Sequence, residues 1–353
     1  MSDQKIALYG ATGFTGRLIA GRLAQGTVEF VIGGRDKEKL EGLTAKLDGS
    51  TTRPDVSVCG VDETDELEAM LADVDLVINC AGPFADVSKP VVRAALRTKT
   101  HYLDTTGEQA FIRWIARECH DDARRRGVTL MPACAFEFAL GDLAAEMALM
   151  KAASRIVIAY AAVDFQMSRG TKKSLARSLA NGGLTYRDGT HHRRRTGYRL
   201  FDVPFPDGES QKGVWVPGGE AMTVPQRGGV SRVETCVVAT GAMTHLAATV
   251  VGLMPGLLRT VLPVVDRVVE KTGGDPDEAP DQGSAFLVIA FDPKTSTPYA
   301  TLRGADIYAT TARIATEAAV RMLGEQPRRT GFVGPADLFE PNDFLKAVGV
   351  EVD

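Results

Sequence analysis

The chain has 353 residues, of which 44% are apolar and 24% are charged, and its formal net charge is −4. Because single domains usually run ~100–200 residues, this length predicts two folded domains. The composition excludes a long disordered chain, and the net negative charge argues against general binding to nucleic acid.

Strand and helix patterns alternate along the first part of the chain. The predicted strands are residues 5–9, 30–32, 56–58, 75–79, 101–103 and 128–131. The predicted helices are residues 15–25, 36–47, 64–71, 89–97 and 108–126. This alternation predicts an α/β domain over residues 1–150, a doubly wound parallel sheet of the Rossmann type.

The pattern changes after residue 152. The β-branched runs at 155–165, 230–240 and 285–291 are separated by loops rich in Gly, Pro and charged residues. They predict a second, mostly antiparallel α+β domain over residues 151–305 that serves substrate binding or dimerisation. Apolar residues at helical spacing after residue 306 predict a helix, and we expect residues 306–353 to return to the Rossmann domain.

A glycine-rich loop lies where the first predicted strand turns into the first helix. Gly10 permits a tight turn, Gly13 lets the backbone approach a pyrophosphate, and Gly16 lets the helix pack closely on the strand. The free N–H groups of the helix N-terminus suit phosphates. The loop therefore predicts a nicotinamide-dinucleotide site, formed by the following residues: Gly10, Thr12, Gly13, Phe14, Thr15 and Gly16.

The end of the second strand bears on the choice between NADP and NAD. An acidic residue about 20 positions beyond the loop would bind the ribose hydroxyl of NAD, but here Arg35 precedes Asp36. A guanidinium suits the 2′-phosphate of NADP, with Lys37 or Lys39 assisting. NADP is therefore the expected cofactor, and Asp36 keeps NAD open.

The end of the fourth strand is expected to contact the same cofactor. This segment follows the point where the strand order reverses, where the ribose and nicotinamide should lie, and its small residues allow a close approach. An ordinary exit from a strand into a loop is the alternative. The expected contacts are Asn79, Cys80, Ala81, Gly82, Pro83 and Phe84.

These segments resemble the saccharopine dehydrogenase-like oxidoreductases, especially the branch that includes trans-acting enoyl reductases of lipid biosynthesis. The resemblance covers most of residues 1–180 and extends to residues 101–108, which are similar to the family's H-Y-x-D-x-x-G-E segment. It implies an NADP-dependent enzyme that reduces a bond of a small, hydrophobic substrate. Residues 135–142 depart from the pattern of the enoyl reductases, so the type of bond stays open.

Hydride transfer belongs to the cofactor, so the protein must supply position and one proton. The candidate donors are Tyr102 and His101, at the end of the fifth strand, and Glu137, after the sixth. Tyr102 is otherwise a buried aromatic with a satisfied hydroxyl, and Glu137 is otherwise a helix cap. No tyrosine is followed by lysine four residues later, which excludes the catalytic pair of short-chain dehydrogenases.

Three functions therefore remain open. The first is an NADP-dependent reductase of a C=C (enoyl) or related bond in a lipid-like substrate. The second is an opine-type or saccharopine-type dehydrogenase of a C=N (imine) bond, with Arg169 and Lys172 as cations for carboxylates. The third is a sensor or scaffold that binds NADP without turnover. The basic run at residues 191–195 is either a solvated loop or, if the protein is such a reductase, a contact for the phosphates of a substrate carrier.

The remaining features concern location and assembly. Five scattered cysteines form no C-x-x-C pair, which predicts neither a metal site nor a disulfide framework, and no signal-peptide pattern begins the sequence, so a cytoplasmic protein is expected. Residues 246–265 are apolar, but Pro255 and Pro263 interrupt them as a membrane span. This segment predicts core, a homodimer face, the wall of an apolar pocket or a peripheral membrane contact.

Overall fold

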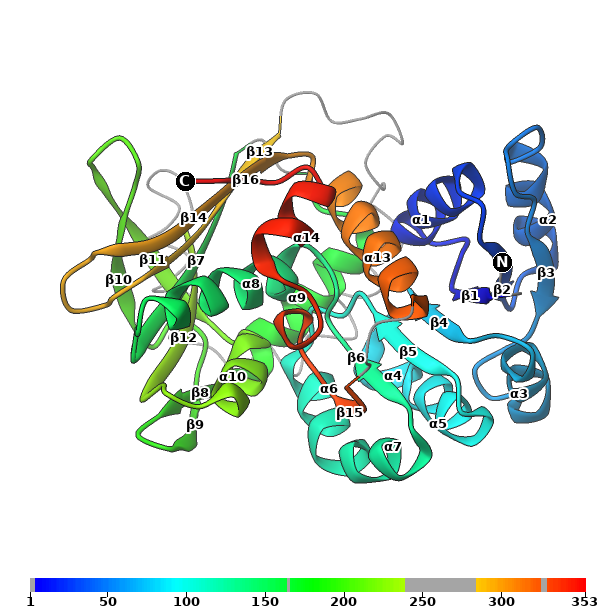
Figure 1. Cartoon of the computed structure of the whole chain (residues 1–353), viewed down its shortest axis with the longest axis horizontal. Helices are drawn as coiled ribbons and strands as arrows, with labels where there is room; N and C mark the ends of the chain where they lie inside the picture. Colours follow the sequence, from blue (N-terminus) through cyan, green and yellow to red (C-terminus); the bar gives the residue numbers. More distant parts are fainter. Residues whose placement is uncertain (1–3, 164–165, 239–283, 325–328) are drawn as a thin grey trace. The chain divides into compact units, whose positions relative to one another are not determined.

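The structure is a computed structural model that describes residues 4–163, 166–238, 284–324 and 329–353. The chain forms two compact units (Figure 1), each built from three separate segments. The first unit contains Met1–Thr106, Phe111–Phe136 and Tyr308–Leu338. The second contains Gly107–Ala110, Glu137–Ile307 and Phe339–Asp353.

The first unit is built on a seven-stranded parallel sheet with the order β15-β6-β5-β4-β1-β2-β3. Its strands are β1 (Lys5–Tyr9), β2 (Glu29–Gly34), β3 (Asp55–Val58), β4 (Leu76–Asn79), β5 (His101–Asp104), β6 (Thr129–Met131) and β15 (Gly331–Phe332). The strand order reverses at β1, which pairs with β2 on one side and β4 on the other. The predicted doubly wound Rossmann sheet is confirmed, and its central strands are buried apolar runs, as in sheets covered on both faces.

Helices connect these strands close to the predicted positions. They are α1 (Phe14–Gln25), α2 (Lys37–Lys46), α3 (Thr64–Ala72), α4 (Phe84–Val87), α5 (Lys89–Thr98), α6 (Gln109–Trp114) and α7 (His120–Arg126). The single helix predicted over 108–126 is interrupted, because Ile115–Cys119 form a π-helical turn between α6 and α7. Such a turn widens the hydrogen-bond spacing, and hydrophobic periodicity does not reveal it.

The C-terminal part of the chain contributes to both units. Helix α13 (Ile307–Leu323) lies where it was predicted, and β15 adds a seventh strand beside β6. Beyond residue 338 the chain belongs to the second unit, where α14 (Pro341–Ala347) is followed by β16 (Glu351–Val352), which pairs with β14. Residues 308–338 thus belong to the first unit and residues 339–353 to the second, and the predicted domain bounds of 1–150, 151–305 and 306–353 stay predictions.

The second unit is built on a mixed sheet with the order β10-β11-β12-β7-β13-β14-β16. Its strands are β7 (Arg155–Val163), β8 (Gly183–Arg187), β9 (Thr190–Arg194), β10 (Leu200–Pro204), β11 (Ser210–Val216), β12 (Arg232–Val238), β13 (Ala285–Phe291) and β14 (Pro298–Ala305), with β16 at the edge. Only β12 and β7 pair in parallel among the described neighbours, so the predicted mostly antiparallel domain is confirmed.

Helices of the second unit are α8 (Phe136–Met150), whose backbone is not helical at Glu137 and Phe138, α9 (Arg169–Asn181) and α10 (Glu220–Thr223), with a 3-10 turn at Val224–Arg227. All but the first residue of α8 fall in this unit, whereas the predicted boundary between domains is residue 150. The sequence change at residue 152 marks the start of the strands, and the compact unit begins earlier because it includes the helix before them.

One face of the second sheet carries an apolar cluster around Trp215. Its buried members are Val157, Ala159, Phe201, Val203, Trp215, Cys236, Val238, Ile289 and Phe291. The indole ring of Trp215 is almost fully buried and contacts Tyr198 edge-on at a centroid distance of 5.0 Å. This cluster is the core that holds strands β7, β10, β11, β12 and β13 together.

The basic run at residues 191–195 lies on β9 and just after it. Among the described strands, β9 pairs only with β8, so it forms an edge, and charged side chains on an edge hinder pairing with another chain. The Arg194 guanidinium lies 5.6 Å from the ring centroid of Tyr198. The protection of this edge strand therefore accounts for the basic run. Its contact with the phosphates of a carrier stays a prediction.

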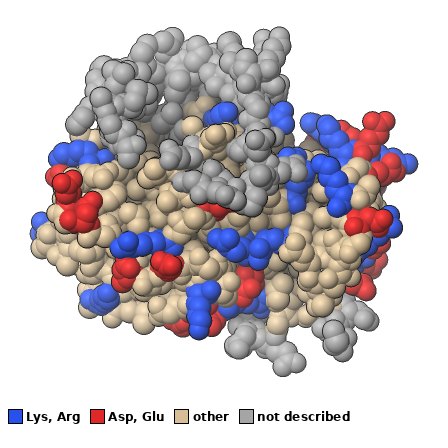
Figure 2. All heavy atoms as spheres, turned by 90° about the horizontal axis from the view of Figure 1, so that it is seen from above, with Lys and Arg blue, Asp and Glu red and all other residues tan. Residues whose placement is uncertain are grey.

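Positive and negative side chains are mixed on the face drawn in Figure 2. No described helix is both long and apolar enough to cross a membrane. The apolar segment predicted over residues 246–265 lies outside the described residues, so its predicted roles stay predictions.

Replacing Trp215 should test the core of the second unit. Trp215→Ala removes a buried indole and leaves a cavity, which should lower the free energy of unfolding by about 3–5 kcal/mol. The half-buried Trp114 of the first unit is the matched control, because its ring stacks on Phe111 but keeps some contact with solvent. Calorimetry should record a much larger loss for Trp215→Ala than for Trp114→Ala, and equal losses would contradict this assignment.

Candidate functional site

The glycine loop joins β1 to α1 and is fixed by the strands on either side. The N–H groups of Gly10 and Ala11 both donate to the carbonyl of Gly33 on β2, at 2.9 and 3.3 Å. Gly10 has a φ of +76°, and a Cβ atom there would lie 2.6 Å from the nitrogen of Ala81. Only glycine therefore lets this loop pass so close to the chain after β4.

Gly16 and Gly13 have different roles. A Cβ atom on Gly16 would lie 2.4 Å from the carbonyl oxygen of Gly10, so this glycine lets α1 start directly against the loop. Gly13 has an ordinary φ of −72°, and a Cβ atom there would meet only the same oxygen, at 3.4 Å. Packing against described residues does not demand glycine at position 13, whereas the close approach of a ligand would.

The N-terminus of α1 is arranged for an anion. The N–H groups of Phe14, Thr15 and Gly16 lie in the first turn of α1, where the helix itself offers no carbonyl to accept their hydrogen bonds. This turn also contains no acidic residue that would repel an anion. Arg17 lies in the same turn and donates from Nη1 to the carbonyl of Thr12 at 2.8 Å. The Phe14 ring is buried edge-on against Tyr308, so Phe14 can offer a ligand its backbone only.

At the end of β2, the two residues that distinguish NADP from NAD have different surroundings. The Asp36 carboxylate caps α2, accepting from the Lys39 N–H at 3.1 Å and pairing with Lys39 Nζ at 2.8 Å. These hydrogen bonds to Lys39 lower the pKa of Asp36. Arg35 is exposed and has no hydrogen-bond or ion-pair partner among the described residues. Arg35 thus suits a 2′-phosphate, and Asp36 has a structural role.

The loop after β4 is held rigidly by two buried side chains. Asn79 Oδ1 accepts from the Ala81 N–H at 3.0 Å, and Ser88 Oγ donates to the Ala81 carbonyl at 2.7 Å. The peptide bond between Gly82 and Pro83 is cis, and α4 begins at the buried Phe84. Because Ala81 lies against Gly10, the structure brings the two predicted cofactor segments together.

Cys80 lies in this loop but is not a candidate nucleophile. Burial raises the pKa of its thiol to about 12, and Thr105 Oγ1 lies 3.9 Å from its sulfur. A thiol with such a pKa stays protonated at neutral pH, and only the thiolate attacks. Its predicted role is therefore limited to shape and backbone contact.

The two candidate donors on β5 are buried in the first unit. Tyr102 is fully buried, and its hydroxyl accepts from Asn79 Nδ2 at 3.0 Å. Burial and the neighbouring Asp104 charge raise the pKa of Tyr102 well above its ordinary value, which makes it a weak acid. His101 Nδ1 accepts from the Thr129 N–H at 3.0 Å, within the sheet. These contacts favour a supporting role, and the donor assignment of both residues stays a prediction.

Asp104 has a structural role at the end of the same strand. Its Oδ1 atom accepts from the N–H groups of Thr106 and Ala133, each at 2.9 Å. Ala133 has a φ of +61°, which costs energy for a residue with a Cβ atom. The Asp104 carboxylate therefore stabilises two turns at the carboxyl edge of the sheet.

The third candidate donor, Glu137, lies in the second unit. It is half-buried, its backbone is extended with φ −67° and ψ 145°, and the next residue, Phe138, has a φ of +73°. Its Oε1 atom lies 3.2 Å from where a Cβ atom on Gly107 would be. Burial raises the pKa of the Glu137 carboxyl, which increases the protonated fraction near neutral pH.

Sequence reasoning missed one group of polar residues in the second unit. Tyr160 on β7 and Glu220 on α10 are both buried and hydrogen-bonded to each other. The two residues are far apart in the sequence and belong to no short motif, so no sequence signal paired them.

Comparison with known proteins finds similarity in the first part of the chain. Residues 6–131 match the family model of the saccharopine dehydrogenase NADP binding domain. The trans-acting enoyl reductase of Mycobacterium leprae (strain TN) is 35% identical over 140 residues, which are 39% of this chain and 34% of that protein. The saccharopine dehydrogenase-like oxidoreductase of Mus musculus is 28% identical over 152 residues, which are 39% of this chain and 35% of that protein.

Among solved structures, the apo histidine-tagged saccharopine dehydrogenase (L-Glu forming) from Saccharomyces cerevisiae aligns over 99% of both chains, with a TM-score of 0.62 and 14% identity. That likeness concerns the fold, and the alignments to the two curated relatives span about a third of their lengths. The resemblance expected from the motifs is confirmed in this region: residues 6–131 match the saccharopine dehydrogenase NADP binding domain.

Substitution of the loop glycines should separate binding from folding. In Gly13→Ala the new methyl group meets little protein, so stability should hold while the Kd for NADPH rises at least about tenfold, or about 1.4 kcal/mol. In Gly10→Ala the methyl group meets the Ala81 backbone, so the protein should lose stability as well. Fluorescence titration and thermal melts measure the two effects, and unchanged NADPH binding in Gly13→Ala would contradict the assigned phosphate site.

Arg35 should decide the preference between the two cofactors. Arg35→Ala should weaken NADPH binding ~10–100-fold, on the order of the 1.5–3 kcal/mol of a charged hydrogen bond, and leave NADH binding unchanged. Lys46→Ala is the control, because Lys46 is an exposed cation at the opposite end of α2. Titration with both nucleotides measures this, and equal losses for NADPH and NADH in Arg35→Ala would rule out a 2′-phosphate contact.

Proposed function

We propose that this chain, whose residues 6–131 are an NADP-binding domain, is an NADP-dependent oxidoreductase that reduces a C=C (enoyl) or related bond of a hydrophobic, lipid-like substrate. The observation that carries the cofactor part is the acid-free N-terminus of α1 beside an open Gly13. The choice of bond is supported by the named activity of the enoyl reductases to which this region is similar.

Bound NADPH would supply a hydride, which adds to one carbon of the double bond, and the other carbon then needs a proton. We assign that proton to the Glu137 carboxyl. Glu137 is half-buried, and its pKa is raised by burial, as a general acid near neutral pH requires. Tyr102 and His101 are less suited, because the sheet of the first unit encloses both.

Reduction of an imine is the second candidate, and one observation favours it. Helix α9 carries four cations, Arg169, Lys172, Lys173 and Arg177, and no acidic residue. A substrate formed from an amino acid and a keto acid has carboxylates that such cations would bind. Binding of NADP without turnover is the third candidate. A homodimer, a role in lipid metabolism and a peripheral membrane contact stay predictions.

A substrate panel should separate these functions. NADPH oxidation, followed by absorbance, should be fast with a long-chain enoyl thioester and absent with mixtures of amino acids and keto acids. Glu137→Gln should lower kcat ~10²–10⁴-fold with little change in NADPH affinity. Because the protonated carboxyl is the acid, the wild-type rate should fall as the pH rises through the pKa of Glu137.

The exposed Glu209 gives the matched control, since Glu209→Gln changes the same charge in a surface turn. Wild-type kcat in Glu137→Gln would place the proton donor elsewhere. Oxidation with an amino acid and keto acid alone would favour the imine reaction. Tight NADPH binding with no turnover on any substrate would favour the sensor or scaffold.

A further inference from the structure

A buried tyrosine and glutamate lie behind the turn that carries Glu137. Tyr160 on β7 donates from its hydroxyl to Glu220 Oε1 at 2.5 Å, and Thr235 on β12 donates to Glu220 Oε2 at 3.3 Å. Both Tyr160 and Glu220 are buried. Burial raises the pKa of Glu220 to about 7, although the hydrogen bonds from Tyr160 and Thr235 act in the opposite direction.

Two glycines make room for this pair. A Cβ atom on Gly141 of α8 would lie 2.1 Å from the Tyr160 hydroxyl and 2.2 Å from Glu220 Oε1. A Cβ atom on Gly218 would lie 2.3 Å from Glu220 Oε2. Two chain segments therefore approach the same carboxyl group at positions where any larger residue would displace it.

The pair is connected to the turn through one backbone hydrogen bond. The Phe138 N–H donates to the Tyr160 hydroxyl at 2.8 Å. With its φ of +73° and ψ of −43°, Phe138 has a conformation that a bulky L-residue rarely adopts, and it persists only where the surroundings enforce it. The hydroxyl of Tyr160 therefore fixes the peptide bond that directly follows Glu137.

We propose that Tyr160 and Glu220 are positioning residues for Glu137: together they hold Phe138 in its strained conformation and so set the direction of the Glu137 carboxyl. The chain of contacts runs from Glu220 to the Tyr160 hydroxyl, from there to the Phe138 N–H, and so to Glu137. This inference rests on the proposed function, because it assigns a purpose to the direction of Glu137.

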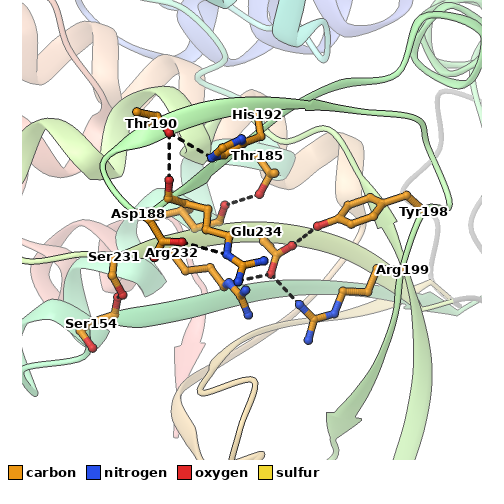
Figure 3. Close-up of polar contacts among 12 residues, drawn as sticks. Ser154, Thr185, Asp188, Thr190, His192, Tyr198, Arg199, Ser231, Arg232 and Glu234 are labelled. Atoms are coloured by element: carbon orange, nitrogen blue, oxygen red, sulfur yellow. Dashed lines mark hydrogen bonds and ion pairs between the residues drawn. The ribbon is translucent and has the colours of Figure 1, made fainter.

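The same sheet contains a second tyrosine–glutamate pair, Tyr198 and Glu234, which is not bonded to the turn at Glu137 and Phe138. Side chains alternate along β12, so Thr235 faces one side with Tyr160, and Glu234 faces the other. Glu234 accepts a hydrogen bond from the Tyr198 hydroxyl, and Arg199 and Arg232 lie beside it (Figure 3). Glu234 Oε2 is 3.3 Å from Arg199 Nη1 and 3.4 Å from Arg232 Nε. Tyr198 is thus also a tyrosine bound to a buried glutamate, but among the described residues its hydroxyl bonds to Glu234 and to no backbone group of positive φ.

The experiment compares Tyr160→Phe with Tyr198→Phe in the full chain, and Glu220→Gln with Glu220→Ala. Two readouts are used: amide hydrogen exchange at Phe138, and kcat with the KM for NADPH on an enoyl thioester. In Tyr160→Phe, exchange at Phe138 should rise about tenfold or more, and kcat should fall at least about tenfold while KM stays within about twofold. Tyr198→Phe should change neither, Glu220→Ala should resemble Tyr160→Phe, and Glu220→Gln should retain most of the activity.

Unchanged exchange at Phe138 in Tyr160→Phe would overturn the inference, whatever the activity. Equal losses of kcat in Tyr160→Phe and Tyr198→Phe would also overturn it, because a general loss of stability would then explain both. If the wild type turns over no substrate but Tyr160→Phe raises the exchange, the hold on Phe138 stands and the proposed reduction fails. If Tyr160→Phe does not fold, Glu220→Ala against Glu220→Gln makes the same comparison.

Discussion

The close contact between Gly10 and the chain after β4 is the constraint on which the cofactor site depends. Two loops from neighbouring strands meet at van der Waals distance only because position 10 lacks a side chain. Helix α1 starts a few residues after this contact, and its unsatisfied N–H groups and the positive end of its dipole lie there. Gly16 must also lack a side chain, because a Cβ atom there would collide with the Gly10 carbonyl oxygen. At Gly13 the protein leaves room for a side chain, so a glycine there serves the approach of the ligand.

Around that contact, buried polar side chains act as fixed supports for loops. Asn79 bonds to Ala81 and to Tyr102, and Asp104 receives two N–H groups from separate turns. Inside the protein such hydrogen bonds are strong, and leaving one of these groups unpaired would be costly. Polar residues at the end of a parallel strand can therefore support the loops of a site, although in the sequence they look like its catalytic residues.

Local patterns predicted most of the first unit, because strand and helix periodicities depend on neighbouring residues. The strand Lys5–Tyr9 matches the prediction, and α1 begins one residue early. Contacts between distant segments were not predictable. Strand β15 pairs with β6 although the two are far apart in the sequence, and Glu220 on α10 bonds to Tyr160 on β7. The π-helical turn after Trp114 and the turn at Phe138 were missed because backbone geometry, not hydrophobic spacing, defines them.

The interleaving of the two units has a consequence for how the protein must be made. During synthesis the ribosome releases β6 long before β15, so β6 can gain this neighbour only after the chain has been made as far as residue 332. The second sheet likewise has to wait for β16 to cover β14. A piece cut after residue 150 would carry the whole nucleotide fingerprint and still lack α13 and β15, so its sheet would be incomplete and liable to pair with other chains.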